Sequence, residues 1–544
     1  MDIHQKIQGR ISYMSPETNT ALMIVLIAAF LGIIAFLSYL GYKKTRNAKD
    51  YLLAGSSIHP FIMAMSYGSA FISTSAIIGF GGVAGRYGMG ILWLAFMNIL
   101  FGIFIGFRYY GRRTRAIGQS LNAHTFPEFM GKRFSSTKIT VFIAAIIFIF
   151  MPVYTSAVLI GGARVMEEVL GISYSSALII FAAIITVYVI MGGLRGMMYV
   201  DALLGTVMVV GMLALLVLTY SSTGSVIDTH KQLTDMAQLV PADMQALGHQ
   251  GWTRMPVFNS PWWWTLVSSL MLGVGIGALA QPQLAVRFMT VKNDTELNKA
   301  ICIGALFILL TAGGAYVVGA LSNVWFFEHE GKIAVDAVGG NHDLIIPVFI
   351  TKALPQWFAY IFTITLLSAA MSTLSALLHV TGTSIGHDFF GNMGVKINTV
   401  TMTKLGILAA IIASVILAFV LPGSFIARAT AIFFGVCAAS FLPAYTAAIY
   451  WKRTTRKGVW ASMISGALIS MFCLAFLHRS ESASLGICQA VFGRTELISN
   501  GVWPFVDSIV YSLPLSAIIL IVVSLITRPE TPEHFKQCFD TIKK

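Results

Sequence analysis

A run of small and hydroxyl-bearing residues interrupts the second long apolar segment of the chain. Residues 65–75 read Met-Ser-Tyr-Gly-Ser-Ala-Phe-Ile-Ser-Thr-Ser, and glycines follow at positions 79, 81 and 82. Five Ser or Thr hydroxyls thus lie inside a segment, residues 60–84, that is long enough to cross a bilayer. Glycine loosens the helical ladder, and carbonyls freed within a membrane must find other partners. The stretch therefore predicts a broken helix that lines a cavity.

A second stretch of the same kind occurs near the middle of the chain. Residues 273–283 read Gly-Val-Gly-Ile-Gly-Ala-Leu-Ala-Gln-Pro-Gln. Each stretch opens a run of five apolar segments, and the second run starts on the opposite side of the membrane from the first. Discontinuous helices at matching positions are typical of inverted-repeat transporters, whose binding site lies near the midplane. Close helix packing through small residues would explain either stretch alone.

The composition indicates a membrane protein throughout. Of the 544 residues 56% are hydrophobic and 11% are charged, whereas soluble domains carry roughly 25% charged residues. The net charge of +13 does not indicate nucleic acid, because the basic residues occupy short loops between apolar segments. The five cysteines form no motif typical of a metal site or a disulfide framework.

We expect an all-α polytopic protein with about thirteen transmembrane helices. Of the 36 Lys and Arg residues, 25 fall on one side when the segments alternate, Arg287 among them. The positive-inside rule makes that side cytoplasmic, with the N-terminus outside and the C-terminus inside. The predicted segments are 20–41, 60–84, 89–109, 138–166, 174–192, 198–221, 262–288, 300–327, 357–386, 402–421, 425–450, 459–478 and 505–527.

The predicted domain organisation follows from these segments. An extra N-terminal helix and a cytoplasmic loop (1–58) precede a first five-helix repeat (59–222). An external loop (223–261) leads to a second, inverted five-helix repeat (262–451). Two C-terminal helices and a short cytoplasmic tail complete the chain (452–544), and residues 343–351 are expected to form a short external helix.

Several polar side chains lie at membrane depth. Ser372, Thr373 and Ser375 fall within one turn of the ninth segment, where hydroxyls either bond back to the helix or coordinate a hard cation such as Na⁺. Asp201 lies a short way into the sixth segment; buried ionisable groups are functional candidates by default, and the alternative is an interfacial carboxylate paired with Arg195. His379 could titrate, but a satisfied structural histidine is the interpretation we favour.

From about Lys49 to Lys457 the chain resembles the solute:sodium symporter family. The resemblance implies a leucine-transporter-like fold with a five-plus-five inverted repeat. The motifs that carry it are the broken segment from Ser69 to Gly82, Phe126-Pro127-Glu128-Phe129 with Lys132-Arg133-Phe134, Gly161-Gly162-Ala163-Arg164, Gly192-Gly193-Leu194 followed by Asp201, Gln281-Pro282 with Arg287, and Ala369 to Ser375.

The resemblance also implies where Na⁺ binds. The main site would use the backbone carbonyls of Ser69, Ile72 and Ala369 with the hydroxyls of Ser372 and Thr373. Some members have a second site, which here would use Asp201, Ser372 and Ser375. Ala376 stands where those members carry a further hydroxyl.

For the solute, the stretch 280–287 is similar to the proline, pantothenate and monocarboxylate branch of the family. That resemblance places an acidic residue where Phe71 stands in proline carriers, which favours a small organic carboxylate over proline. Backbone N–H groups at a half-helix start suit a carboxylate. We expect Ser73, Thr74, Tyr154 and Gln281 to line the substrate pocket.

The sequence thus predicts a sodium-coupled symporter that imports a small solute by alternating access. Its partners would be the solute, Na⁺ and the lipid bilayer of an inner or plasma membrane, with no nucleic acid, as a monomer or homodimer. The alternatives are a proline-like amino-acid symporter of the same family and a proton-coupled carrier using Asp201 or His379. No constellation typical of an enzyme is found, and a sensor would need a larger tail than the residues after Ile526 provide.

Overall fold

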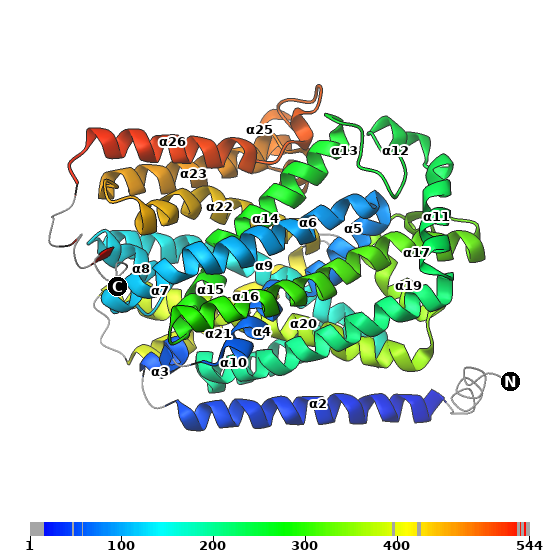
Figure 1. Cartoon of the computed structure of the whole chain (residues 1–544), viewed down its shortest axis with the longest axis horizontal. Helices are drawn as coiled ribbons and strands as arrows, with labels where there is room; N and C mark the ends of the chain where they lie inside the picture. Colours follow the sequence, from blue (N-terminus) through cyan, green and yellow to red (C-terminus); the bar gives the residue numbers. More distant parts are fainter. Residues whose placement is uncertain are drawn as a thin grey trace.

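The computed structural model of the chain is almost entirely helical (Figure 1). It describes residues 16–529 except 46–47, 57, 394–397 and 422–425, together with residues 534, 538 and 539. The predicted C-terminal tail therefore lies almost wholly outside the described residues. Within them, the only strand-type pairing is one bridge between Ile58 and Val291. The all-α prediction is confirmed.

Eleven helical stretches among the described residues are long and apolar enough to cross a membrane. A bent pair of helices, α4 (Pro60–Phe71) continued by residues 75–87, makes a twelfth. The stretches are Val25–Lys44, Met89–Ser120, Thr137–Glu167, Tyr174–Thr223, Pro261–Ala280, Asp294–Glu330, Gln356–Met393, Thr399–Val420, Ala429–Tyr450, Arg456–Phe476 and Ile509–Ile526.

The longest of these stretches contains two predicted spans. Helix α10 (Tyr174–Thr223) has 50 residues, about 75 Å at 1.5 Å per residue, whereas the hydrocarbon core is about 30 Å thick. It breaks at Gly193, where φ is 55° and ψ is −173°. A Cβ there would lie 2.7 Å from the ring of Tyr51, so glycine is required both by the backbone and by the packing. Counting both halves of α10 gives the expected thirteen spans.

The remaining helices surround the two broken ones. Helix α20 (Gln356–Thr383) packs against α4, α10 and α9 (Thr137–Leu170), and 89% of the residues in its apolar 18-residue stretch are buried. By contrast, α2 (Pro16–Lys44) lies along the edge of the molecule, and 22% of the residues in its apolar stretch are buried (Figure 1). Helices α22 (Ile426–Tyr450), α23 (Arg456–Phe476) and α26 (Ile509–Ile526) pack together at the opposite edge.

Short helices gather at the two ends of the long ones (Figure 1). At one end lie α11 (Val226–Asp235), α12 (Ala242–Ala246) and α19 (Ile345–Ala353). Thus the predicted loop 223–261 contains helices of its own, and the short helix expected at 343–351 is confirmed with a shift of two residues. At the other end lie α3 (Ala48–Leu53), α7 (Arg112–Ser120) and α8 (Phe126–Arg133).

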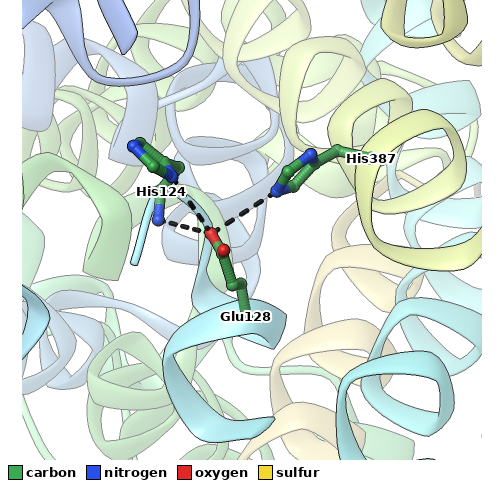
Figure 2. Close-up of side chains that lie close together, drawn as sticks. All are labelled: His124, Glu128 and His387. Carbon is green, nitrogen blue, oxygen red and sulfur yellow. Dashed lines mark hydrogen bonds and ion pairs between the residues drawn. The ribbon is translucent and has the colours of Figure 1, made fainter. Parts of the chain in front are cut away.

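The two ends of the described chain lie at opposite ends of the bundle. Helix α2 begins at the end that carries α11 and α19, and α26 finishes at the end that carries α7 and α8 (Figure 1). An odd number of spans requires this arrangement. At the α8 end, the chain before α8 also meets the continuation of α20, where His124, Glu128 and His387 lie together (Figure 2). Which end faces the cytoplasm remains the prediction made from charge, as do the repeat boundaries.

Candidate functional site

The first broken helix opens between Phe71 and Ser75. Helix α4 ends at Ile72, whose backbone is extended (φ −92°, ψ 100°), and helical structure resumes in η2 (Ser75–Gly79) and α5 (Phe80–Tyr87). The two halves are bent by 57°. The residues that bracket the break are the hydroxyl-bearing ones, so this part of the sequence interpretation is confirmed.

The glycines that follow the break have a different purpose. A Cβ on Gly82 would lie 2.0 Å from the carbonyl oxygen of His342, and one on Gly319 would lie 1.9 Å from that of Gly81. These contacts hold α5 against α17 (Gly314–Glu330) and the chain before α19. Close packing through small residues therefore explains Gly81 and Gly82, while the break at 72–74 is a separate feature.

The second broken helix opens at Gln281. Helical structure from α13 (Pro261–Trp264) through η7 (Ala278–Ala280) stops there, with φ −75° and ψ 116°, and Pro282 starts α15 (Pro282–Ala285). A Cβ on Gly277 would lie 2.9 Å from the carbonyl oxygen of Phe434, so this helix lies directly against α22. Both broken helices contact α22.

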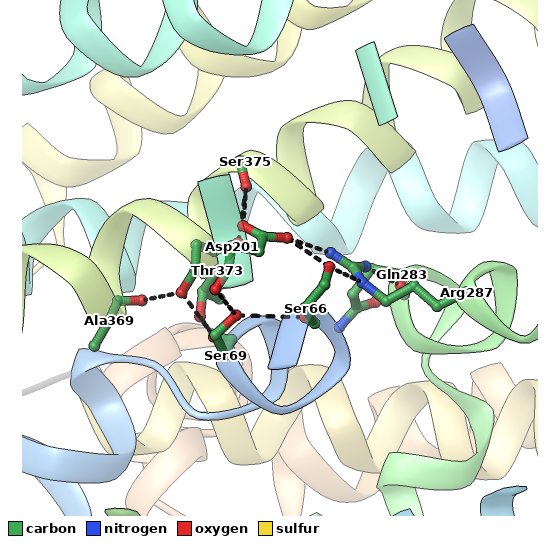
Figure 3. Close-up of polar contacts among 9 residues, drawn as sticks. Ser66, Ser69, Asp201, Gln283, Arg287, Ala369, Thr373 and Ser375 are labelled. Atoms are coloured by element: carbon green, nitrogen blue, oxygen red, sulfur yellow. Dashed lines mark hydrogen bonds and ion pairs between the residues drawn. The ribbon is translucent and has the colours of Figure 1, made fainter. Parts of the chain in front are cut away.

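Four of the five predicted sodium ligands lie together between α4 and α20, and Figure 3 labels three of them, Ser69, Ala369 and Thr373. The Ser372 hydroxyl donates to the Ser69 carbonyl at 2.8 Å and to the Ala369 carbonyl at 3.2 Å. The Thr373 hydroxyl donates to the Ser69 carbonyl at 3.3 Å. All four residues are fully buried. Neutral carbonyl and hydroxyl oxygens at such spacings are the donor type that a hard cation binds.

The fifth predicted ligand is the carbonyl of Ile72. This residue is the C-cap of α4, one turn after Ser69, and its extended backbone takes its carbonyl out of the helical ladder. It lies on the α4 side of the break. Its coordination of the ion remains a prediction.

A buried ion pair adjoins the predicted sodium ligands. One guanidinium nitrogen of Arg287 lies 3.2 Å from the carboxylate of Asp201, and both side chains are completely buried. Ser66 donates to the same carboxylate oxygen at 2.7 Å, and Ser375 donates to the other at 3.4 Å. Figure 3 shows the carboxylate between Ser375 on one side and Arg287 on the other.

This pair changes two expectations about Asp201. Its partner is Arg287 and not Arg195, which lies near Asp50 and donates to the carbonyl of Ala54. The predicted second cation site does bring Asp201 and Ser375 together, and Ser375 also donates to the carbonyl of Ser372. A guanidinium already supplies the positive charge there.

Arg287 differs from its prediction as a cytoplasmic charge. The structure buries it in η8 (Val286–Thr290), seven residues before the next helix α16 (Asp294–Ile308). One signal was available. Arg287 follows the Gln-Pro break by one and a half helical turns. The short helical segment after the break directs its side chain toward the core and away from solvent.

The predicted substrate residues are only partly brought together. The Tyr154 hydroxyl donates to the Ser73 hydroxyl at 3.5 Å, and Ser73 accepts from the N–H of Ser75 at 3.1 Å. The hydroxyls of Thr74 and Ser75 are buried and have no hydrogen-bond partner among the described residues. The side-chain amide of Gln281 instead bonds within its own segment, to Gly277 and Gln283.

Aromatic rings surround the first break, a group that the sequence pattern does not predict. Tyr154 stacks on Phe433 with ring centroids 5.5 Å apart and meets Phe434 edge-on at 5.8 Å. Phe71 stacks on Phe434 at 6.1 Å. The Phe-Phe pair of α22 was the available signal, but its position opposite Tyr154 follows only from the tertiary fold.

His379 is a satisfied structural residue, as expected. It is buried on α20, and its Nε2 donates to the backbone carbonyl of Tyr51 at 3.2 Å. Its ring also packs beside the ring of Tyr51, with centroids 5.8 Å apart. Because this nitrogen is committed to the carbonyl, the geometry does not favour His379 as a proton carrier.

Comparisons with known proteins agree with this architecture. The profile of the sodium:solute symporter family matches residues 51–466. The osmoregulated proline transporter of Bacillus subtilis (strain 168) is 26% identical over 487 residues, covering 88% of this chain and 92% of that protein. Sodium/proline symporter 2 of Staphylococcus saprophyticus is 25% identical over 484 residues, covering 87% and 89%.

A solved structure shows the same fold. The substrate-bound outward-open state of a Na⁺-coupled sialic acid symporter aligns with a TM-score of 0.72 at 15% identity, covering 94% of this chain and 98% of that one. The expected leucine-transporter-like fold is thereby confirmed. Since the family profile matches most of the chain, from α3 into α23, the protein belongs to the sodium:solute symporter family.

Proposed function

We propose that this protein is a sodium-coupled symporter that imports proline or a closely similar amino acid. The observation that carries the coupling is the meeting of Ser69 and Ala369 carbonyls with the Ser372 and Thr373 hydroxyls between α4 and α20. Na⁺ would replace the hydrogen bonds that these groups now make with one another. Binding would hold the broken helix against α20 and so fix the backbone at the substrate pocket.

The comparisons change which solute we favour. The two relatives described above are proline carriers, which favours the amino-acid alternative over the organic carboxylate that the sequence analysis placed first. The residue at position 71 is phenylalanine, whereas the resemblance places an acidic residue there in proline carriers. The ring of Phe71 stacks on Phe434, so the pocket here is more apolar at this point.

The chemistry around the first break suits a compact zwitterion. The hydroxyls of Thr74 and Ser75, which have no hydrogen-bond partner among the described residues, can donate to a carboxylate. The rings of Tyr154, Phe433 and Phe434 offer faces to an apolar ring and to an ammonium group. The nearby charges of Asp201 and Arg287 compensate each other. A substrate without net charge therefore fits better than an anion.

We infer an alternating-access cycle. Na⁺ enters from outside, completes the pocket at the first break, and is followed by the solute. Movement of the broken helices against α9 and α20 then opens the site to the cytoplasm. The membrane potential contributes roughly 2.3 kcal/mol per charge per 100 mV. A zwitterion carried with one Na⁺ would move one positive charge, whereas a monocarboxylate carried with one Na⁺ would move none.

The test is uptake of labelled proline, pantothenate and small monocarboxylates into proteoliposomes, with Na⁺ gradient and membrane potential imposed separately. We expect Na⁺-dependent proline uptake that is accelerated by an inside-negative potential. Carboxylate uptake whose rate does not change with the membrane potential would support the organic-acid alternative instead. Uptake driven by a pH gradient without Na⁺ would overturn the sodium assignment.

A matched pair of variants on α20 tests the sodium ligands directly. Ser372→Ala should raise the Na⁺ concentration for half-maximal uptake at least about tenfold, because a direct ligand is lost. Ser368→Ala is the control, since the Ser368 hydroxyl lies one turn earlier and donates only to the carbonyl of Ile364 at 2.7 Å. Equal Na⁺ dependence of the two variants would contradict the proposed site.

A further inference from the structure

Three side chains capable of binding a metal converge at the α8 end of the molecule, away from the transport site. His124 lies just before α8, Glu128 lies within it, and His387 lies in η11 (Ser384–Phe390), which continues α20. One possible ligand atom from each residue lies within 4.8 Å of the other two. Figure 2 shows both imidazoles directed at the carboxylate of Glu128.

The distances come close to those of a tetrahedral site. Both His124 Nδ1 and His387 Nε2 lie 3.4 Å from the same oxygen, Oε2 of Glu128. Metal–ligand distances of about 2.0–2.1 Å in a tetrahedral Zn²⁺ site place neighbouring ligand atoms about 3.3–3.4 Å apart. Two edges of such a site are therefore present, and only the separation between the two imidazoles has to close.

Lys132 and the two imidazoles approach different oxygens of the Glu128 carboxylate. Lys132 lies 2.7 Å from Oε1, while Oε2 also accepts the backbone N–H of His124 at 2.6 Å. An ionised carboxylate is the form that binds a metal ion, and Oε2 is the oxygen that both imidazoles approach.

The surroundings leave the cluster accessible. Asp388 follows His387 and is buried; one of its oxygens accepts from the Thr125 hydroxyl at 2.7 Å, and the other has no hydrogen-bond partner among the described residues. The side chains of His124, Glu128 and His387 are 20%, 15% and 25% exposed. An ion can therefore reach the cluster, and a water molecule can complete its coordination.

We propose that His124, Glu128 and His387 form a binding site for a divalent transition-metal ion of the Zn²⁺ type. Two imidazoles and one carboxylate are a donor set that binds Zn²⁺ with an open fourth position. The site joins the connection between α7 and α8 to the end of α20. Because α20 also carries Ser372 and Thr373, about 21–23 Å away along the helix, a bound ion would brace the helix that holds the sodium ligands.

Metal binding can be measured without any assumption about the transported solute. The full chain, purified without a histidine tag and stripped with a chelator, is titrated with Zn²⁺ and, for a spectroscopic signature, with Co²⁺. We expect one equivalent per chain and the visible absorption of four- or five-coordinate Co²⁺. His124→Ala and His387→Ala should each weaken binding by more than the roughly 10- to 100-fold that loss of a second-shell partner costs.

The controls separate this site from other histidines and cysteines. His230→Ala, on α11 at the other end of the molecule, should bind Zn²⁺ like the parent protein, because the His230 ring is hydrogen-bonded to the Tyr220 hydroxyl at 3.0 Å and lies far from the cluster. The double variant His124→Ala/His387→Ala gives the background. Parent protein that binds no more Zn²⁺ than this double variant, or that lacks the Co²⁺ absorption, would overturn the proposal.

A second experiment tests whether the bound ion restrains α20, and it rests on the proposed function. Zn²⁺ on both sides of the proteoliposome membrane should slow Na⁺-driven uptake by the parent protein and leave His387→Ala unaffected. Equal inhibition of both proteins would show that Zn²⁺ acts elsewhere. If proline is not the solute, uptake fails in both proteins before Zn²⁺ is added, whereas the binding titration is unchanged.

Discussion

Breaking the buried pair of Asp201 and Arg287 should destabilise the core around the predicted sodium ligands. The two groups are 3.2 Å apart, which corresponds to about 5 kcal/mol of attraction at an effective dielectric constant of roughly 20. Arg287→Gln leaves the Asp201 carboxylate buried without a countercharge. Breaking a buried pair in this way costs about 3–5 kcal/mol, so we expect a loss of that size in the free energy of unfolding.

The assay is a double-mutant cycle, with unfolding in a denaturing detergent followed by tryptophan fluorescence. Asp201→Asn/Arg287→Gln should lose less than the sum of the two single variants, because it leaves no unpaired charge. Arg112→Gln is the control, since Arg112 and Asp294 are 2.8 Å apart but 43% and 32% exposed, and such pairs contribute about 0–1 kcal/mol. Additive effects, or an Arg287→Gln loss no larger than the control, would refute the reasoning.

Three further predictions follow from single sites. One Na⁺ per cycle, with a Hill coefficient of about 1 for Na⁺, is expected because Arg287 already neutralises Asp201; a coefficient near 2 would contradict this. Tyr154→Phe removes the hydroxyl that lies 3.5 Å from that of Ser73. Loss of a hydrogen bond worth about 0.5–1.5 kcal/mol should raise KM for the solute roughly 2- to 12-fold and leave the Na⁺ dependence unchanged. Gly193→Ala should have a much lower melting temperature than Gly192→Ala. The backbone φ at Gly193 is +55°, whereas a Cβ at Gly192 makes only an ordinary contact at 3.6 Å. Similar melting temperatures would argue against strain at Gly193.

His249, in the loop 223–261, supplies a pH-dependent case. Burial lowers the pKa of His249 to about 4, against a hydrogen bond to the carbonyl of Arg86 that raises it. The unfolded chain then binds a proton that the folded chain does not between roughly pH 6.5 and 4. Stability should therefore fall as pH drops through that window. The melting temperature of His249→Gln should fall less from pH 7 to pH 5; an identical fall in both proteins would exclude the mechanism.

Much of the fold could be predicted because the bilayer restricts what an apolar segment can do. Spans, breaks and alternation of charge are local properties of the chain, so the broken segments at 65–75 and 273–283 were identified correctly. The family resemblance predicts five sodium ligands, and four of those residues lie together. Repeat boundaries and membrane sidedness remain predictions.

Other features depended on contacts between residues distant in sequence. The hydroxyl of Ser372 meets the carbonyl of Ser69 across 303 positions, and the Arg287 guanidinium reaches Asp201 across 86. The side-chain pattern around Arg287 is that of any cytoplasmic loop. Its burial is decided by the short helix after Gln281, which turns the chain back into the core.

The sequence by itself determined that this chain crosses a membrane many times, that two of its helices are broken, and that neutral oxygens lie at membrane depth. Each of these follows from composition and spacing, which act locally on backbone hydrogen bonding in lipid. Only the tertiary structure decided that Arg287 neutralises Asp201, that Phe433 and Phe434 face Tyr154, and that His124 and His387 approach one carboxylate. Those pairings arise where separate helices pack, and no local pattern encodes which side chains then meet.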